Sequence, residues 1–359
     1  MKLRIAIALF IIHNSSFIIS PAQAQFWHAL PPIDTSKTLS ACFSNDEKKV
    51  FYLSKDGGAA NIWGMTIADK YGGIIAGPAN PPVQITKFTA TGIVRFFHLL
   101  NRPEILYMRL ADDGKDYHIY RIKDDGSGQP EDLTPGPEGV TSEIIGASYN
   151  GKYVYFTNNK VSHDKVDVYR YDTQQFSSDL VFPNDKDYKV LAWTRDQKRL
   201  LIEDSSSRSY MIYDIETTER TPIDIPSDKN ITSVGLDPRD SLSSTGYELQ
   251  MLGFKFYPNP TENVDTIRMK NMMMKSAFEI DYSANCKYSM SRIHGTSGTW
   301  CVKESATGTS LSIPEGGHPL SIAPKGTMLI YSLPSSGNAS KIFLYNIAKN
   351  SSTELATVR

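Results

Sequence analysis

The sequence has few cysteines, no long apolar run beyond its first residues, and no excess of charge of either sign. Its 359 residues include three cysteines, and 38 basic side chains stand against 39 acidic ones. This balance, with no block of lysine or arginine, argues against nucleic acid or an anionic membrane as the main partner. Since a bilayer span needs about 20 apolar residues, we also expect no membrane span in the mature chain.

Motifs of common catalytic and metal sites are missing as well. The chain contains no G-x-S-x-G, no phosphate-binding P-loop, no CxxC and no H-x-H, and its seven histidines are scattered. A serine outside a nucleophile elbow, without a histidine partner, is an ordinary turn serine. We therefore expect no catalytic residue, no metal and no cofactor. His98 and His118, both in predicted strands, are interpreted as hydrogen-bonded structural side chains.

The three cysteines allow at most one internal disulfide. Cys286 and Cys301 are the nearest pair. A hairpin predicted from strands 287–294 and 299–305 would set Cys301 opposite about residue 291, several residues from Cys286. This register disfavours the bridge, and whether the two are bridged stays open. Cys42, in the apolar run LSACFS, is predicted to be an ordinary buried thiol.

The N-terminus has the features of a secretory signal. Lys2 and Arg4 precede the short apolar run Ile5 to Ile12, and Ala22-Gln-Ala24 forms a small-residue cleavage site. We expect cleavage after Ala24, which makes residues 1–24 a signal peptide and residues 25–359 the mature chain. The expected location is the periplasm, with secretion as the alternative.

A short pattern recurs six times: an aromatic residue two places before an apolar one, at the end of a β-rich run. The successive steps are 57, 49, 44, 87 and 45 residues, and 87 is close to two ordinary steps. The aromatic anchors are Trp63, Tyr120, Tyr169, Tyr213, Trp300 and Tyr345. Repeats of about 40–50 residues built from short strands are typical of β-propeller blades. The sequence therefore predicts one all-β domain of four-stranded antiparallel blades, seven in number, with six as the alternative.

Turn signals divide most repeats into four strands. Asn150-Gly151 between two apolar runs, for example, is a strong hairpin signal. Four complete blades are predicted before the long step, with strands at 39–44, 49–54, 61–67 and 82–88; 93–100, 104–111, 117–123 and 131–135; 142–148, 152–159, 166–172 and 177–182; and 189–194, 199–205, 209–215 and 220–225. Two more follow it, at 278–283, 287–293, 299–305 and 310–314, and at 319–324, 327–334, 340–346 and 353–358. Within these strands, side chains such as Leu106, Met108, Leu110, Val154 and Phe156 are expected to face adjacent blades.

The long step itself is predicted to hold a modified fifth blade. Strands at 231–238 and 247–258 precede a run with helical spacing, which predicts one short helix near 262–276 in place of an outer strand. The helix contains four methionines, Met269, Met272, Met273 and Met274. We interpret them as a flexible apolar surface that packs on the propeller, rather than as a soft-metal site.

Several of these strands carry a family resemblance. Residues 105–114, 118–135, 234–238 and 278–293 resemble the propellers of prolyl-oligopeptidase-family serine peptidases and of TolB-like periplasmic proteins. The resemblance spans roughly residues 90–316, and it identifies a fold better than an activity. In the peptidases the propeller gates an α/β-hydrolase domain, whereas here the residues after Gly316 are predicted to form one more blade. The resemblance thus implies a gate without its enzyme.

The expected function is that of a non-enzymatic TolB-like propeller that binds a protein or peptide partner of the cell envelope. We expect a monomer, and we identify Phe26 and Trp27, in the segment 25–37, as a candidate partner-binding arm, with closure of the first blade as its other possible role. Two alternatives stay open. One is a hydrolase or lyase with a site at a channel mouth, and the other is the propeller subunit of a separately encoded serine peptidase.

Overall fold

The computed structural model describes residues 40–223 and 278–358, apart from short gaps, together with the pairs 235–236 and 249–250. The gaps fall at 57, 69–72, 74, 76–79, 113, 149–150, 163–164, 187, 195–196, 208, 283–286, 293–299, 305–306, 312, 315 and 338. Every regular element in these residues is a β-strand. In this part of the chain there is accordingly no helix with the length and apolarity to cross a membrane.

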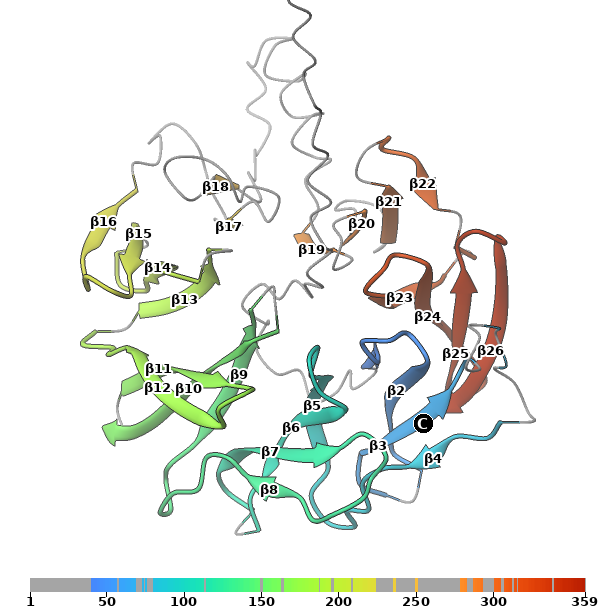
Figure 1. The fold of residues 1–359 in the computed structure, drawn as a ribbon, viewed down its shortest axis with the longest axis horizontal. Helices are drawn as coiled ribbons and strands as arrows, with labels where there is room; N and C mark the ends of the chain where they lie inside the picture. Colours follow the sequence, from blue (N-terminus) through green and yellow to red (C-terminus); the bar gives the residue numbers. More distant parts are fainter. Residues whose placement is uncertain are drawn as a thin grey trace, which may run out of the picture.

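Six four-stranded antiparallel sheets stand around a common centre, as the blades of a propeller do (Figure 1). The first blade pairs β1 (Ala41–Phe43), β2 (Lys49–Ser54), β3 (Asn61–Thr66) and β4 (Val83–Gln84). The second pairs β5 (Ile93–His98), β6 (Glu104–Leu110), β7 (Tyr117–Lys123) and β8 (Glu131–Asp132). The third pairs β9 (Ser142–Ala147), β10 (Tyr153–Ser162), β11 (Lys165–Asp172) and β12 (Ser177–Phe182).

The later blades follow the same plan. The fourth pairs β13 (Tyr188–Trp193), β14 (Arg199–Asp204), β15 (Ser209–Asp214) and β16 (Arg220–Pro222), and it is followed by a two-stranded pair, β17 (Gly235–Leu236) and β18 (Leu249–Gln250). The penultimate blade pairs β19 (Phe278–Tyr282), β20 (Tyr288–Arg292), β21 (Trp300–Glu304) and β22 (Ser310–Leu311). The last pairs β23 (His318–Ile322), β24 (Met328–Pro334), β25 (Ser340–Asn346) and β26 (Ser351–Val358).

The predicted fold class is confirmed, since each predicted four-stranded blade is present with its strands paired in chain order. Strands β17 and β18 lie inside the two strands predicted for the fifth blade. The number of blades, seven or six, stays a prediction. The proposed helix near 262–276, the cleavage site after Ala24 and the arm with Phe26 and Trp27 lie outside the described residues.

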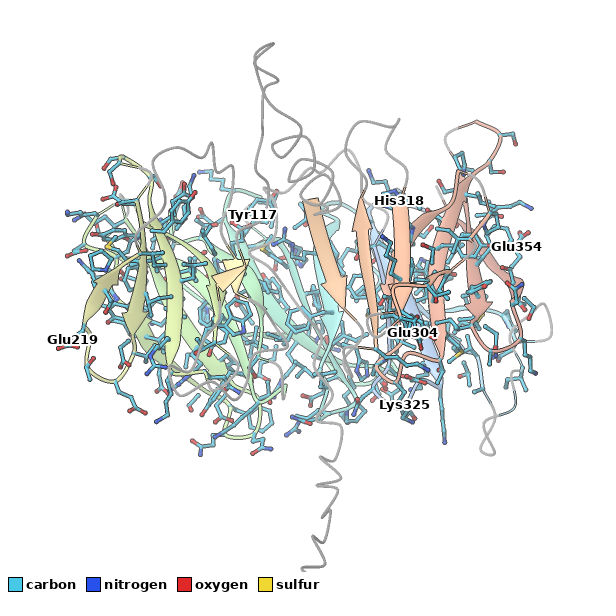
Figure 2. All side chains as sticks on the ribbon, turned by 90° about the horizontal axis from the view of Figure 1, so that it is seen from above. Tyr117, Glu219, Glu304, His318, Lys325 and Glu354 are labelled. Carbon is cyan, nitrogen blue, oxygen red and sulfur yellow. The ribbon has the colours of Figure 1, made fainter. Side chains whose placement is uncertain are left out.

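Successive turns alternate between two faces of the ring, because each blade is an up-and-down meander. Tyr117 and His318 lie near one face and Lys325 near the other (Figure 2). Lys325 lies in the turn between the first two strands of the last blade. The Lys325 face therefore carries the turns between first and second strands and between third and fourth strands, and the Tyr117 face carries the rest.

Apolar side chains fill the spaces between neighbouring blades, as the strand alternation predicts. Leu106 and Met108 of the second blade share a buried cluster with Val154 and Phe156 of the third. Each large apolar side chain removed from water in this way contributes about 1.5–3 kcal/mol before the entropy cost of ordering it. The blades are consequently held together mainly by stacking of their faces.

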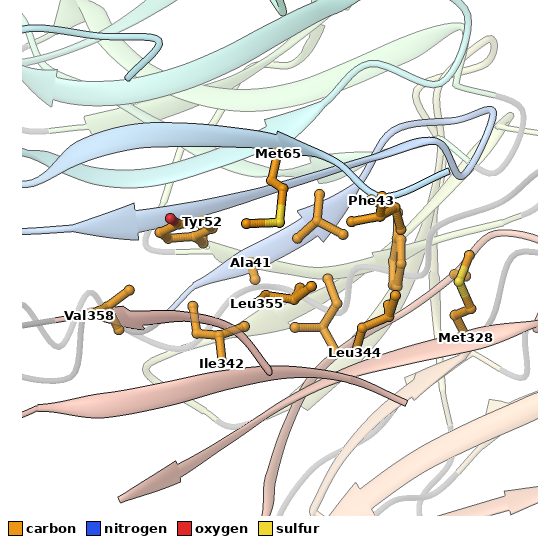
Figure 3. Packing of buried hydrophobic residues seen from close by; sticks show 13 residues of the cluster. Ala41, Phe43, Tyr52, Met65, Met328, Ile342, Leu344, Leu355 and Val358 are labelled. Carbon is orange, nitrogen blue, oxygen red and sulfur yellow. The ribbon is translucent and has the colours of Figure 1, made fainter. Parts of the chain in front are cut away.

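The ring is closed by the first blade packing on the last (Figure 3). Both blades are complete from consecutive strands in the described residues, so no exchanged strand is needed there. Glu47 reinforces this contact from the turn after β1. Its carboxylate accepts hydrogen bonds from the Lys325 backbone N–H and, at 2.6 Å, from the Thr327 hydroxyl, while its own φ is 61°. The buried acid thus ties the two ends of the described chain together.

The cysteine predictions agree with the structure where it describes them. Cys42 is buried on β1, and burial raises the pKa of its thiol to about 12. A thiol in this state is unreactive near neutral pH. Cys301 is opposite Ser291 in the β20–β21 hairpin, as the predicted register requires. Cys286 lies outside the described residues.

Candidate binding surface

A tight turn at residues 172–176 joins the last two strands of the third blade. The Asp172 carboxylate accepts hydrogen bonds from the backbone N–H groups of Gln174 and Gln175, at 2.8 and 2.9 Å. The Phe176 N–H then donates to the Asp172 carbonyl oxygen at 2.9 Å, which closes the turn. This closure leaves Phe176 in the left-handed region, with φ of 56°.

The same kind of turn in other blades places different residues at that position. Thr218 in the fourth blade, Gly308 in the penultimate and Asn350 in the last also have positive φ, at 63°, 69° and 49°. Glycine and asparagine suit this conformation, whereas a side chain with a bulky ring costs about 1–2 kcal/mol there. The turn itself does not require phenylalanine, so the strain at Phe176 points to a role for the ring outside the turn.

Two arginines of the second blade hold this ring. The guanidinium carbons of Arg102 and Arg121 lie 4.3 and 4.1 Å from the centroid of the Phe176 ring, within cation–π range. Nevertheless, 42% of Phe176 remains exposed. The ring therefore sits at the boundary of the second and third blades, on the Lys325 face, with its cationic neighbours already in position.

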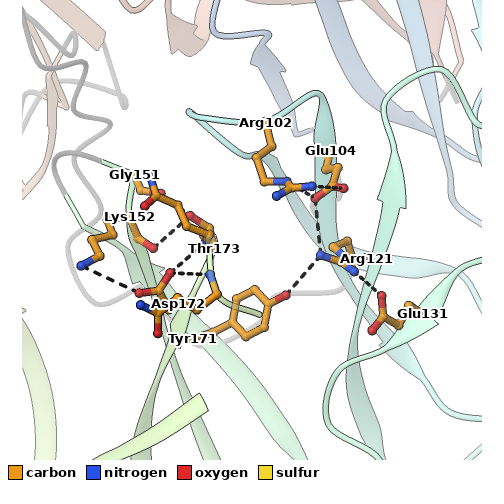
Figure 4. A network of polar contacts seen from close by, with 11 residues as sticks. Arg102, Glu104, Arg121, Glu131, Gly151, Lys152, Tyr171, Asp172 and Thr173 are labelled. Carbon is orange, nitrogen blue, oxygen red and sulfur yellow. Dashed lines mark hydrogen bonds and ion pairs between the residues drawn. The ribbon is translucent and has the colours of Figure 1, made fainter. Parts of the chain in front are cut away.

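A polar network fixes the two arginines (Figure 4). Arg102 donates to Glu104 at 3.0 Å, and Arg121 pairs with Glu131 and lies 3.7 Å from Glu104. Burial alone would lower the pKa of Arg121, but its hydrogen bond to Glu131 and the nearby Tyr171 and Glu104 raise it. Both guanidiniums stay charged, so they can orient an aromatic ring and a partner at little entropic cost.

Exposed apolar side chains are concentrated on this blade. Six large hydrophobic residues are exposed in the described part of the chain, and four of them belong to β10, the β11–β12 turn and their neighbours. These four are Val161, Val166, Phe176 and Leu180, with exposed fractions of 70, 41, 42 and 47%. Val161 and Val166 flank the β10–β11 hairpin on the Tyr117 face, whereas Phe176 and Leu180 lie in the β11–β12 turn and on β12. We refer to Phe176 and Leu180 as the third-blade apolar edge.

Two histidine–aspartate pairs lie in the second blade, where the sequence predicted structural histidines. His98 Nε2 lies 3.1 Å from Asp124, and His118 Nδ1 lies 2.7 Å from Asp132. Both rings are buried, which confirms their interpretation as hydrogen-bonded structural side chains. In the described ranges, no group of three or more His, Cys, Asp or Glu residues is arranged to hold a metal ion.

The pair at Asp124 also joins two blades. Lys49 of the first blade donates to the Asp124 carboxylate at 2.9 Å, opposite His98. Burial alone would raise the pKa of Asp124, but the hydrogen bonds from His98 and Lys49 outweigh it and lower the pKa. The His98 ring in turn stacks on Phe51, with centroids 5.4 Å apart. This buried acid therefore serves to lock the first blade to the second.

Nearer the centre of the ring, one charged pair bridges the first strands of the second and third blades. Arg95 of β5 lies 3.4 Å from the Glu143 carboxylate and donates to the Ile144 carbonyl oxygen at 2.8 Å. Burial raises the pKa of Glu143 and lowers that of Arg95, and each charge partly opposes the effect on the other. Arg95 thereby gives the Ile144 carbonyl oxygen of β9 a hydrogen-bond donor, so the pair has a structural role.

Sequence reasoning did not single out Phe176, Leu180, Arg102 or Arg121. One signal was available for Phe176. The segments Asp172-Thr-Gln-Gln-Phe176 and Asp214-Ile-Glu-Thr-Thr218 occupy the same place in successive repeats, and only the first ends on an aromatic residue. The sequence around Arg102 and Arg121 gave no such signal, because the ring that both contact, that of Phe176, belongs to another blade.

No protein-family model matches the sequence. It is 29% identical over 160 residues to dipeptidyl aminopeptidase BIII of Pseudoxanthomonas mexicana, a region that covers 40% of this chain and 21% of that protein. Among solved structures, a prolyl endopeptidase is similar over 94% of this chain and 51% of its own, with a TM-score of 0.50 and 9% identity. TolB of Acinetobacter baumannii is similar over 88% of this chain and 53% of its own, with a TM-score of 0.36 and 15% identity.

The likeness to prolyl endopeptidase confirms at the level of fold the resemblance drawn from the sequence. The chain spans about half the length of that enzyme, and the aligned region is about a fifth of the dipeptidyl aminopeptidase. The similarity therefore establishes the β-propeller fold.

Proposed function

We propose that this protein is an exported, non-enzymatic β-propeller that binds a protein or peptide partner in the cell envelope. The third-blade apolar edge is the observation that carries the proposal. Exposed apolar groups gathered on one part of a surface mark interaction sites more often than single exposed residues do. Aromatic and arginine side chains, like those at Phe176, are also the residues that most often dominate binding energy.

A periplasmic location belongs to the same proposal. Its support is the basic start, the short apolar run and the small-residue site that ends at Ala24. The described polar clusters at Asp124, Asp132 and Glu143 support a non-enzymatic role, because each already has a structural partner between strands or blades.

The similarity to a dipeptidyl aminopeptidase favours one second candidate. In this version the partner is a hydrolase, encoded separately, over which the propeller acts as a gate. The contact surface would be the same kind of apolar edge, but the partner would carry serine-peptidase activity. Identifying the partner separates the two candidates.

Affinity capture of the tagged mature protein from crosslinked cell envelopes tests the proposal. We expect the wild type to recover one defined envelope protein, and Leu180→Asp to recover about tenfold less, because the charge must be desolvated at the contact. Val83→Asp is the matched control, since Val83 is 60% exposed on the first blade. Equal recovery by both variants, or no defined protein with the wild type, would contradict the proposal. Recovery of a hydrolase would support the second candidate.

A further inference from the structure

The outer strand of the third blade differs from most other outer strands in length. β12 has six residues, whereas β4, β8 and β22 have two each and β16 has three. It is the outermost strand of its sheet, and the described residues include no strand paired with it on the outer side. Its first four residues, Ser177 to Leu180, are exposed, and at about 3.4 Å per residue they offer an edge of about 14 Å with outward-pointing backbone N–H and C=O groups.

Two large apolar side chains lie along this exposed edge. Ser177 to Leu180 are all exposed, and large apolar side chains mark both ends of that stretch, at Phe176 and Leu180. Exposed edge strands usually carry charges or proline that prevent pairing. The one charge on β12 is Asp179, whose carboxylate lies 3.6 Å from Arg170 on the neighbouring strand.

The last blade supplies an internal comparison. Its outer strand, β26, is even longer, at eight residues, but none of the exposed large hydrophobic residues of the described chain lies on it. Glu354 on this strand pairs with Lys341 at 2.8 Å. Length alone therefore does not mark β12. The combination of a long edge with exposed apolar residues does.

We propose that the partner binds by strand addition to β12. An extended segment of five or more residues would pair with the outward backbone groups, and its alternate apolar side chains would contact Phe176 and Leu180. Main-chain hydrogen bonds supply affinity in this mode, and alternate side chains supply specificity. The inference rests on the proposed partner-binding function, and it adds the conformation and side-chain pattern of the bound segment.

Peptides selected from a random twelve-residue phage library on the immobilised mature protein provide the probe. The best binder is synthesised in two forms, N-methylated at odd or at even positions. Because alternate N–H groups of a strand point to opposite sides, one form should bind at least tenfold more weakly and the other within about threefold of the parent, given about 1 kcal/mol per hydrogen bond. On the protein, Leu180→Lys should weaken binding about tenfold, and Thr357→Lys on β26 should not.

Each alternative outcome counts against strand addition. Equal effects of the two N-methylated forms, or equal effects of Leu180→Lys and Thr357→Lys, would overturn it, as would failure to enrich any peptide. These results would leave the proposed function to be judged by envelope capture. If recovery of the envelope partner depended on Leu180, but the odd- and even-methylated peptides bound equally well, the partner would bind through side chains alone. If neither the dependence on Leu180 nor the difference between the methylated peptides were observed, the proposed function would be rejected as well.

Discussion

Replacing Phe176 by asparagine is expected to abolish partner binding while leaving the fold as stable as before. Asparagine accepts the left-handed conformation at this position, as Asn350 does in the last blade. The relief of about 1 kcal/mol offsets the loss of the contacts to Arg102 and Arg121, worth about 0.5–1 kcal/mol each at an exposed site. The partner, in contrast, would lose an aromatic anchor, and such anchors cost about 2 kcal/mol or more when truncated.

Two measurements on one variant separate these effects. Urea denaturation should give a free energy of unfolding within about 1 kcal/mol of the wild type, while recovery of the envelope partner should fall at least tenfold. Thr218→Asn, in the corresponding turn of the fourth blade, should leave partner recovery unchanged and raise stability by no more than about 1 kcal/mol, through the same relief of backbone strain. If Phe176→Asn instead lost more than about 2 kcal/mol of stability and kept its partner, Phe176 would be a structural residue that joins two blades.

Asp124→Asn is expected to destabilise the fold strongly. The carboxylate accepts from both Lys49 and His98 in a buried position, and hydrogen bonds to a charged group contribute about 1.5–3 kcal/mol. Asparagine keeps the shape, but its amide oxygen can accept from only one of Lys49 and His98, and its uncharged NH2 group meets the other. We expect a loss of about 2 kcal/mol in the free energy of unfolding, measured by urea denaturation at pH 7.

The effect should depend on pH in a defined direction. Because the folded-state pKa of Asp124 is lowered, its ionisation stabilises the fold fully above the unfolded value of about 4. That contribution is lost as the pH falls through the lower, folded-state pKa. The difference in stability between wild type and Asp124→Asn should therefore shrink as the pH falls below about 4.

Asp125, next to Asp124, provides a control. Its carboxylate is exposed and bonds only to Ser127 within the same turn, so Asp125→Asn should change stability by less than about 0.5 kcal/mol. If Asp124→Asn changed the free energy of unfolding as little as Asp125→Asn does, or if its effect grew as the pH fell, Asp124 would not stabilise the contact between the first and second blades.

The strands were predictable because each is short, apolar and bounded by turn residues. Tyr117–Lys123 and Lys49–Ser54 were predicted with the bounds that the structure has. The spacing of the repeats then predicted the order of the blades, because each blade of a propeller is one repeat and the repeats follow one another along the chain. That Leu106 and Val154 face the boundary between their blades, where they share one buried cluster, was predictable from strand alternation.

The polar locks and the binding surface were not predictable in the same way. Lys49 and Asp124 are 75 residues apart, in different blades, and no spacing rule links them. Glu47 meets Lys325 only because the ring closes. Phe176 looks like an ordinary turn residue until its backbone conformation and its two arginine neighbours are known.

The proposed function requires that a partner in the cell envelope contacts the third blade. Its most direct test is a photo-reactive phenylalanine analogue placed at position 176 or, as a control, at position 218, with irradiation of living cells. We predict a discrete crosslinked product from position 176, identified by mass spectrometry as one envelope protein, and none from position 218. No product from position 176, or the same product from both, would contradict it.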